Sequence, residues 1–300
     1  MWTGLELLFV LQDLRNSMPD LVTDFMRTIS MAQFQYFVPV LLIAFLFWFM
    51  NRKDAEFFMF TYGLSLLVSY FVKDLVKQPR PWDLDPSIEP DPYSKAHAEN
   101  KSLPSGHTTA ALASFGLLAV IYKNPIVRIV CIILTLIIPF SRMYLGVHTP
   151  LDLIVSVVIV LVLAYLNNKI LPWSHENEKR RFYTLLGYLA VIVILTIGTG
   201  LISNGHIYSN KMGGFCLGMV IGLILEEHFV KYETPELPLE RKAILSIPGL
   251  VVIGILFFAP FMLMKSDGVF LGGFLSMMFV TLIYPWILKR YVIRDGAVSE

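Results

Sequence analysis

The sequence predicts an all-α fold, a polytopic integral membrane bundle of about 8–9 transmembrane helices with an N-terminal interfacial amphipathic segment. Composition supports this, because hydrophobic residues make up 56% of the 300 residues and charged residues only 16%. The apolar residues also form successive runs of about 18–22, each long enough to cross a hydrocarbon layer of about 30 Å as a helix. The formal net charge is +1, so we expect no binding of nucleic acid.

The N-terminal segment, residues 1–31, is amphipathic rather than apolar all round. Residues 3–14 are apolar but short and are interrupted by Glu6 and Asp13. Residues 20–29 place apolar and charged side chains on opposite faces of a helix. Helices of this kind suit the membrane interface better than a crossing.

Two further segments follow: residues 32–171, which contain three polar motifs, and residues 172–300, a group of transmembrane helices whose role the sequence leaves open. Spans are expected over the ranges 33–50, 55–72, 107–122, 126–143, 150–168, 182–203, 212–230, 245–264 and 268–288. Longer polar stretches separate some of these spans: a proline-rich loop at 82–103 and linkers at 173–181 and 231–242.

The first motif, KDLVKQPRP at 73–81, places basic residues at the end of an expected span. An extended helix would carry Lys73 and Arg80 on one face, because they are two helical turns apart. An arginine fork can grip two phosphate oxygens, and a lysine adds a mobile point charge. Prolines on both sides of Arg80 fix its backbone, which favours ligand binding over a snorkelling cluster at a helix end. Lys77 fits a solvated side chain better.

The second motif, PSGH at 104–107, precedes an apolar run. Ser105 can cap the helix that starts here, and Gly106 lets the backbone approach a ligand at an anion-binding helix N-terminus. An ordinary helix cap would explain these two residues, but not His107 in the first turn at the membrane rim. Since two other ionic motifs are present, we expect His107 to be functional.

The third motif, SRMYLGVHTPLD at 141–152, puts ionisable side chains between two apolar runs. A neutral His148 can attack phosphorus. Asp152, four residues later, is within reach of the other ring nitrogen, where a carboxylate holds the reactive tautomer. Residues 149–152 also match a helix capping box with proline at the first helical position, and the two roles are compatible. Arg142 would complete a phosphate site.

These groups suffice for phosphoryl transfer, which mainly requires that the phosphoryl group be positioned and its charge neutralised. One histidine can be the nucleophile while the other protonates the leaving group. The sequence has no cluster of carboxylates that would hold a pair of Mg²⁺ ions, so we expect neither a metal nor another cofactor.

The ordered set KDLVKQPRP, PSGH and SRMYLGVHTPLD resembles the three motifs of the type 2 phosphatidic acid phosphatase family, with no departure at the motif positions. The resemblance covers about residues 33–170. It implies a metal-independent membrane hydrolase that removes a terminal phosphate from a lipid or polyprenyl (pyro)phosphate. It further implies that His148 becomes phosphorylated, that His107 is the general acid and that Asp152 is the partner of His148. The implied phosphoryl-binding residues are Lys73, Arg80, Ser105, Gly106 and Arg142.

The distribution of basic residues predicts which way the motifs face. If the motifs share one side, the turns on the other side hold 14 of the 24 lysines and arginines: Arg52, Lys53, Lys123, Arg128, Lys169, Lys179, Arg180, Arg181, Lys231, Arg241, Lys242, Lys289, Arg290 and Arg294. Short loops rich in lysine and arginine stay in the cytoplasm. We therefore expect a multi-pass protein of the cell membrane with its active site on the extracytoplasmic or lumenal side.

The C-terminal helices carry two stripes of glycine, at positions 214, 218 and 222 and at 268 and 272. Such stripes allow close helix packing, within the chain or in a homodimer. Glu226, Glu227 and His228 are interpreted as a solvated helix end rather than a relay. His97, His175 and His206 are interpreted as solvated loop residues.

Two other functions stay open at this point. A lipid phosphotransferase would use the same phosphohistidine but pass the phosphoryl group to an acceptor other than water, so release of free phosphate separates it from a hydrolase. A non-enzymatic lipid carrier would need no nucleophile. Paired halves with broken spans are expected for a carrier, and the prolines of this chain are not arranged so.

Overall fold

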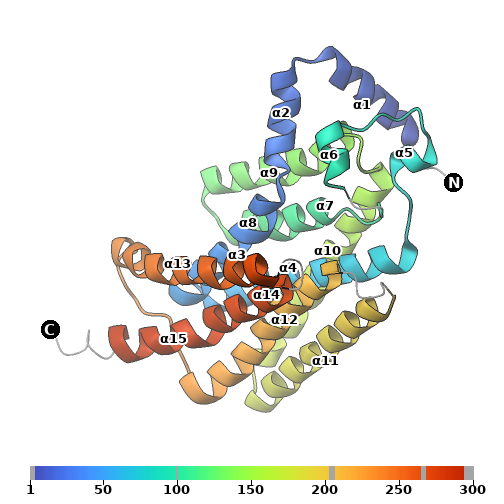
Figure 1. Ribbon diagram of the computed structural model, residues 1–300. Coiled ribbons are helices and arrows are strands. Elements are labelled where there is room, and N and C mark those ends of the chain that lie inside the picture. The colour runs from blue at the N-terminus through green and yellow to red at the C-terminus, as the bar shows by residue number, and fades with distance from the viewer. Residues whose placement is uncertain (1–3, 99–100, 203–206, 265–267, 294–300) are drawn as a thin grey trace. The chain divides into compact units, whose positions relative to one another are not determined.

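The protein is represented by a computed structural model that describes residues 4–98, 101–202, 207–264 and 268–293, without the side chains of residues 32–36, 207–211 and 293. All regular elements within these ranges are helices (Figure 1). The prediction of an all-α fold is confirmed.

Seven helical stretches of the described chain are long and apolar enough to cross a membrane. They comprise α4 (Arg52–Val76), α9 (Pro125–Tyr144), α10 (Pro150–His175), α11 (Glu178–Ile202), α12 (Ile207–Leu225) with its π-helical continuation η2 (Glu226–Val230), α13 (Leu239–Met264), and a final stretch of α14 (Gly268–Met278), η3 (Phe279–Ile283), α15 (Tyr284–Ile287) and η4 (Leu288–Ile293). The chain is a multi-pass membrane protein, as predicted.

Two shorter apolar stretches, Phe37–Phe49 and Gly106–Ile121, account for the remaining expected spans. The first belongs to α3 (Ala32–Phe49), and the second consists of α7 (Gly106–Ala111), the π-helical turn η1 (Leu112–Gly116) and α8 (Leu117–Ile121). The other helices are α1 (Leu5–Ser17), α2 (Asp20–Ile29) and two short ones in the polar loop, α5 (Pro81–Leu84) and α6 (Pro92–Ala96).

The predicted linker at 173–181 is wrong, because most of it is helical. Helix α10 continues to His175 and α11 begins at Glu178. The side chain of Asn177 accepts hydrogen bonds from the backbone N–H groups of Lys179 (2.9 Å) and Arg180 (3.3 Å). These bonds satisfy the first free donors of α11, so two residues suffice for the break between the helices.

The chain folds into two compact units, and each unit consists of two separate stretches of the sequence. Unit 1 consists of Met1–Pro39 and Val68–Ala164, and unit 2 consists of Val40–Leu67 and Tyr165–Glu300. All three polar motifs belong to unit 1. The predicted division into consecutive segments 1–31, 32–171 and 172–300 follows chain order and stays a prediction.

In unit 1, α9 packs against the N-terminal helices as well as against the helices that directly precede it. Both α1 and α2 contact α9, and so do α7, η1 and α8. Leu8 and Leu11 of α1 pack with Ile88 of the polar loop in one apolar cluster, while Tyr144 and Leu145 belong to a second. The third motif is therefore covered by the N-terminal helices.

In unit 2, α12 and α14 lie side by side (Figure 1) and pack through glycine. A Cβ atom on Gly214 or Gly218 would collide with the carbonyl groups of Phe270 and Phe274 of α14. Gly268 and Gly272 allow α14 to approach α13 in the same way. Both stripes thus serve packing within the chain, and the homodimer stays an untested prediction.

Candidate active site

The first motif turns back on itself instead of extending α4. The helix ends at Val76, and Lys77 adopts the left-handed conformation with φ 52°. Arg80 follows in an extended conformation, with φ −74° and ψ 161°. The expectation that Lys73 and Arg80 share a helical face is therefore wrong. Prolines 79 and 81 prevent continuation of the helix, and the reversal brings Arg80 toward the third motif.

Lys73 and Arg80 are both buried, with 7% and 4% of their surfaces exposed. The Lys73 ammonium donates to the carbonyl groups of Lys101 (3.1 Å) and Ser102 (3.3 Å). Arg80 Nη1 donates to the carbonyl of Val147 at 2.7 Å. Lys77, by contrast, is exposed, in agreement with its interpretation as a solvated side chain.

The second motif begins a helix, as predicted. Ser105 Oγ accepts hydrogen bonds from the backbone N–H (3.3 Å) and the hydroxyl (3.0 Å) of Thr108, so it caps α7. The backbone N–H of Ser105 donates to the carbonyl of Asp152 at 3.3 Å, which ties this helix start to the third motif. Gly106 is buried at the first position of α7.

His107 is half-buried in the first turn of α7. Its ring interacts electrostatically with four groups of the other motifs: Arg142, His148, Lys73 and Arg80. Because such interactions fall off steeply with distance, the second motif belongs to the same cluster as the first and third.

His148 lies between Arg80 and Asp152. Its Nε2 is 3.1 Å from Arg80 Nη1, and its Nδ1 is 3.2 Å from Asp152 Oδ2. Arg80 Nη1 is also 3.5 Å from Nδ1. Because an arginine has donors but no acceptor and the Asp152 carboxylate is an acceptor beside Nδ1, we assign Nε2 as the unprotonated nitrogen. Nδ1 then carries the proton and donates it to Asp152, which leaves the lone pair of Nε2 facing the cations.

The surroundings keep this imidazole neutral. Burial, together with the positive charges of Arg80, Lys73 and Arg142, holds the pKa of His148 well below its ordinary value of 6.5. Only 2% of the residue is exposed. A neutral ring that keeps a lone pair on Nε2 is the form that can act as a nucleophile.

Asp152 has both of the contacts that the sequence allowed. Its Oδ2 accepts from the backbone N–H of Thr149 at 2.7 Å, as in a helix cap, and also faces His148. A third donor is the hydroxyl of Ser102, at 2.6 Å. The carboxylate is fully buried, so these hydrogen bonds fix its orientation.

The sequence reasoning missed Ser102. Its side chain bonds to Asp152, its carbonyl accepts from Lys73, and its backbone N–H donates to the carbonyl of Gln78 at 2.8 Å. It is fully buried although it belongs to a stretch that was interpreted as a polar loop. Its position just before the second motif was the only signal available.

Arg142 is 7% exposed, and its Nη1 donates to the hydroxyl of Ser30 at 2.9 Å. The predicted site residues therefore converge in unit 1: Lys73, Arg80, Ser105, Gly106, His107, Arg142, His148 and Asp152. In the parts of the chain that the structure describes, no group of three or more histidine, cysteine, aspartate or glutamate side chains is placed to share a metal ion.

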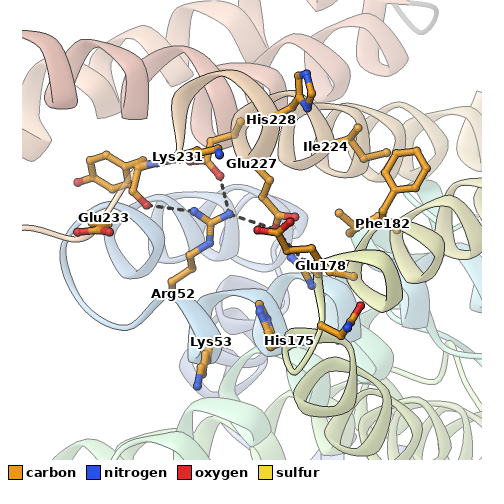
Figure 2. A pocket seen from close by; sticks show the side chains of 15 residues that line it. Arg52, Lys53, His175, Glu178, Phe182, Ile224, Glu227, His228, Lys231 and Glu233 are labelled. Carbon is orange, nitrogen blue, oxygen red and sulfur yellow. Dashed lines mark hydrogen bonds and ion pairs between the residues drawn. The ribbon is translucent and has the colours of Figure 1, made fainter.

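Unit 2 contains a second cluster of buried charges, at a cavity of about 640 Å³. Figure 2 shows Arg52 in this cluster, with hydrogen bonds and ion pairs extending from its guanidinium group. Arg52 pairs with Glu56 (3.0 Å), Glu226 (2.5 Å) and Glu227 (3.2 Å). Arg181 pairs with Glu56 (2.8 Å) and Glu227 (2.7 Å).

This cluster corrects two interpretations of the sequence. Glu226 is fully buried and both Glu226 and Glu227 are paired with arginines, so these two do not form a solvated helix end, whereas His228 is exposed as expected. His175 is not a solvated loop residue, because it ends α10 and its Nε2 is 2.9 Å from Glu56 Oε2. His97 is exposed and contacts only the carbonyl of Tyr93 among its described polar contacts, as expected. His206 lies outside the described residues.

Comparisons with known proteins agree with the motifs. A family model described as the PAP2 superfamily matches residues 55–176, and a second, described as the PAP2 superfamily phosphatase transmembrane extension, matches residues 210–295. The chain is similar to the undecaprenyl-diphosphatase BcrC of Bacillus subtilis (strain 168), with 29% identity over 116 residues. That alignment covers 39% of this chain and 57% of the relative's length. No solved structure matches the chain.

The two family matches lie on either side of α11 and together cover most of the chain. The first contains all three motifs, and the second contains α12 and the final helical stretch. The chain therefore belongs to the PAP2 superfamily, with the transmembrane extension of its phosphatases.

Proposed function

We propose that the protein is a membrane lipid phosphatase, which hydrolyses the terminal phosphate of a lipid or polyprenyl (pyro)phosphate through a phosphohistidine intermediate. The observation that carries this proposal is the position of His148, with Nε2 toward Arg80 and Nδ1 toward Asp152. Family membership supports the reaction class.

In the first step, the Nε2 lone pair of His148 attacks phosphorus and the bond between phosphorus and the leaving oxygen breaks. His107 gives its proton to that oxygen, which departs as an alcohol or as a polyprenyl monophosphate. The positive charge that develops on the His148 ring is stabilised by Asp152, whose orientation Ser102 and Thr149 maintain.

In the second step, water attacks the phosphorus of the phosphohistidine and His107 removes a proton from that water. The bond between phosphorus and Nε2 breaks, which returns the lone pair to His148 and releases inorganic phosphate. Lys73, Arg80, Arg142 and the N–H group of Gly106 bind the phosphoryl oxygens in both steps, while the N–H group of Ser105 keeps the helix start beside Asp152.

The substrate class follows from the membrane setting and from the relative. A multi-pass chain with a site at the ends of its helices suits a head group carried by a membrane-embedded tail. The name of the similar protein specifies an undecaprenyl diphosphate. We therefore propose a polyprenyl (pyro)phosphate as the first substrate to test for this chain.

The test is phosphate release by the purified full chain in detergent from undecaprenyl diphosphate and from phosphatidic acid, with and without a chelator. We expect turnover that the chelator leaves unchanged, because the proposed chemistry uses only side chains and backbone. Rapid acid-free quenching with labelled substrate should trap label on His148. Loss of turnover in chelator, or labelling that persists in His148→Ala, would reject the mechanism.

We also propose that the site faces the extracytoplasmic side. Both native cysteines are buried, Cys131 at 6% exposure and Cys216 at 0%, so an engineered thiol can be labelled selectively. Ala96→Cys in the polar loop should react with an impermeant thiol reagent added to intact cells, whereas Lys123→Cys in the turn before α9 should react only after lysis. The reverse pattern would contradict the assignment.

A further inference from the structure

The N-terminal helices make a polar contact with a predicted phosphate-binding residue. Arg142 Nη1 donates to Ser30 Oγ at 2.9 Å, and Ser30 immediately follows α2. The Ser30 hydroxyl in turn donates to the carbonyl of Arg27 at 3.2 Å, so its lone pairs are available to Arg142. Only 5% of Ser30 is exposed. Ser30 itself lies outside the three motifs.

Ser30 is itself held in place by an ion pair between the partly exposed Arg27 and the buried Asp91. Arg27 donates to Asp91 Oδ1 from Nε (3.0 Å) and Nη2 (2.5 Å), and the Asp91 side chain is 1% exposed. The backbone N–H of Asp91 donates to the carbonyl of Leu145 at 2.9 Å. The contacts therefore run from Arg142 through Ser30, Arg27 and Asp91 to Leu145. We call this a closed series, because Leu145 is only three residues after Arg142.

The same helices hold Tyr144 between these two residues. Arg15 Nη1 donates to the Tyr144 carbonyl at 2.9 Å, and the hydroxyl groups of Thr23 and Tyr144 are 3.2 Å apart. The N-terminal segment thus fixes consecutive residues of the stretch that leads to His148.

The ion pair stays charged over the neutral range. Burial alone would raise the pKa of Asp91, but hydrogen bonds from Arg27 and Ser94 outweigh it, and the pKa lies below its ordinary value of 3.8. The hydrogen bond to Asp91 also raises the pKa of Arg27. Because a carboxylate with a lowered pKa loses its contribution only as the pH falls through that value, the anchor persists at all pH values above about 4.

We propose that α1 and α2 are part of the phosphate site, and that Ser30 is a positioning residue that holds the Arg142 guanidinium ready for the phosphoryl group. This inference rests on the proposed function, in which Arg142 binds phosphate. A free arginine side chain loses rotamer freedom when it grips an anion, so an arginine already held by Ser30 binds at a smaller entropic cost. An N-terminal segment that serves only as an interfacial anchor would not need this contact.

The experiment measures binding of inorganic phosphate to the full chain in detergent, by its inhibition constant in phosphate release and by direct titration. Ser30→Ala should weaken phosphate binding roughly 10-fold, as expected for loss of a hydrogen bond to a charged group. Ser30→Thr keeps the hydroxyl and should restore binding to within about twofold. Ser17→Ala is the matched control, because Ser17 is exposed and bonds only to the Leu14 carbonyl among its described contacts.

Equal phosphate binding by Ser30→Ala and Ser17→Ala would overturn the inference, provided that Arg142→Ala binds phosphate more weakly. If Arg142→Ala also binds as the unmodified chain does, the phosphate-binding role of Arg142 in the proposed function fails instead. Should Ser30→Ala not fold, Asp91→Asn removes the charge that anchors Arg27 and keeps the shape of the side chain. The same weakening is expected there, and unchanged binding would count against the inference.

Discussion

The cations of the candidate active site and the two arginines of the unit 2 cluster are held by different kinds of acceptor. In the site, Lys73 and Arg80 donate to backbone carbonyls and Arg142 to a serine hydroxyl. These three cations and the one carboxylate beside His148, Asp152, leave a sum of +3 − 1 = +2. That excess suits a phosphoryl group, whose negative charge neutralises it on binding.

In unit 2, the two arginines are held by carboxylates. Arg52 and Arg181 face Glu56, Glu226 and Glu227, so the sum is +2 − 3 = −1, and a protonated His175 would bring it to zero. Charges that neutralise one another serve the fold and leave little attraction for an anion. The comparison teaches that the sum of the charges around a group of buried cations, rather than the cations alone, separates an anion site from an ion-pair network.

The largest contrast is expected between two histidines. His148→Ala should lower kcat by at least about 10⁴-fold, because it removes the nucleophile. His175→Ala, in the other cluster, should change kcat by less than about threefold, since Glu56 keeps both arginine partners. Phosphate release by equal amounts of folded protein measures both. Similar losses in the two variants would break the comparison.

Replacing one arginine in each region should mainly affect different properties: stability for Arg52 in unit 2, and activity for Arg80 in the candidate active site. Arg52→Met leaves buried Glu56 and Glu226 with fewer partners, and we expect about 3–5 kcal/mol lower free energy of unfolding. Arg80→Met removes one of several like charges, so we expect kcat to fall about 10²–10³-fold. Its stability should fall by about 1–3 kcal/mol, because the buried carbonyl of Val147 loses its donor. Denaturant unfolding in detergent measures the free energy of unfolding of both variants, and phosphate release measures their kcat. A stability loss in Arg80→Met as large as that in Arg52→Met would contradict this expectation.

Ser102 sharpens the comparison within the site. Ser102→Ala removes one of three donors to Asp152 and should lower kcat about 10-fold with little effect on KM, because Asp152 acts on the charge that develops during reaction. Ser102→Thr, which keeps the hydroxyl, should recover most of the rate. A change confined to KM would mean that Ser102 acts through Lys73 instead.

The smallest expected effect concerns pH. The folded protein holds the pKa of His148 below the ordinary 6.5, so between these two values the unfolded chain binds more protons than the folded one. Stability should therefore fall as the pH drops below about 6.5. His148→Gln removes this contribution, and its midpoint of thermal unfolding should decrease less between pH 7.5 and 5.5. An equal decrease in both proteins would refute the assignment.

Sequence reasoning worked where the signal is local. Runs of apolar residues located the spans, and Ser105 and Asp152 were recognised as helix caps from their immediate neighbours. The family resemblance, which two family matches confirm, brought the three motifs together. The roles of the individual site residues stay predictions.

What sequence reasoning missed depends on contacts between distant segments. Arg27 fits the polar face of an interfacial helix equally well, and only the fold shows that Asp91, 64 residues later, is its partner. Glu226 resembles any charged helix end until Arg52, 174 residues earlier, is placed beside it. The reversal of the chain at Lys77 was missed because the seven-residue spacing of Lys73 and Arg80 also fits a continuing helix. No periodicity in the sequence encodes these pairings.

The closed series of contacts around Arg142 has a consequence for biosynthesis. Ser30, Thr23 and Arg15 meet partners that lie 112, 121 and 129 residues later in the chain. At about 5–20 residues per second, a ribosome needs roughly 6–25 s to reach those partners after it has made the first helices. A nascent chain halted before Tyr144 would carry two of the motifs but lack His148 and Asp152, so the hydrolase stays inert until its insertion is well advanced.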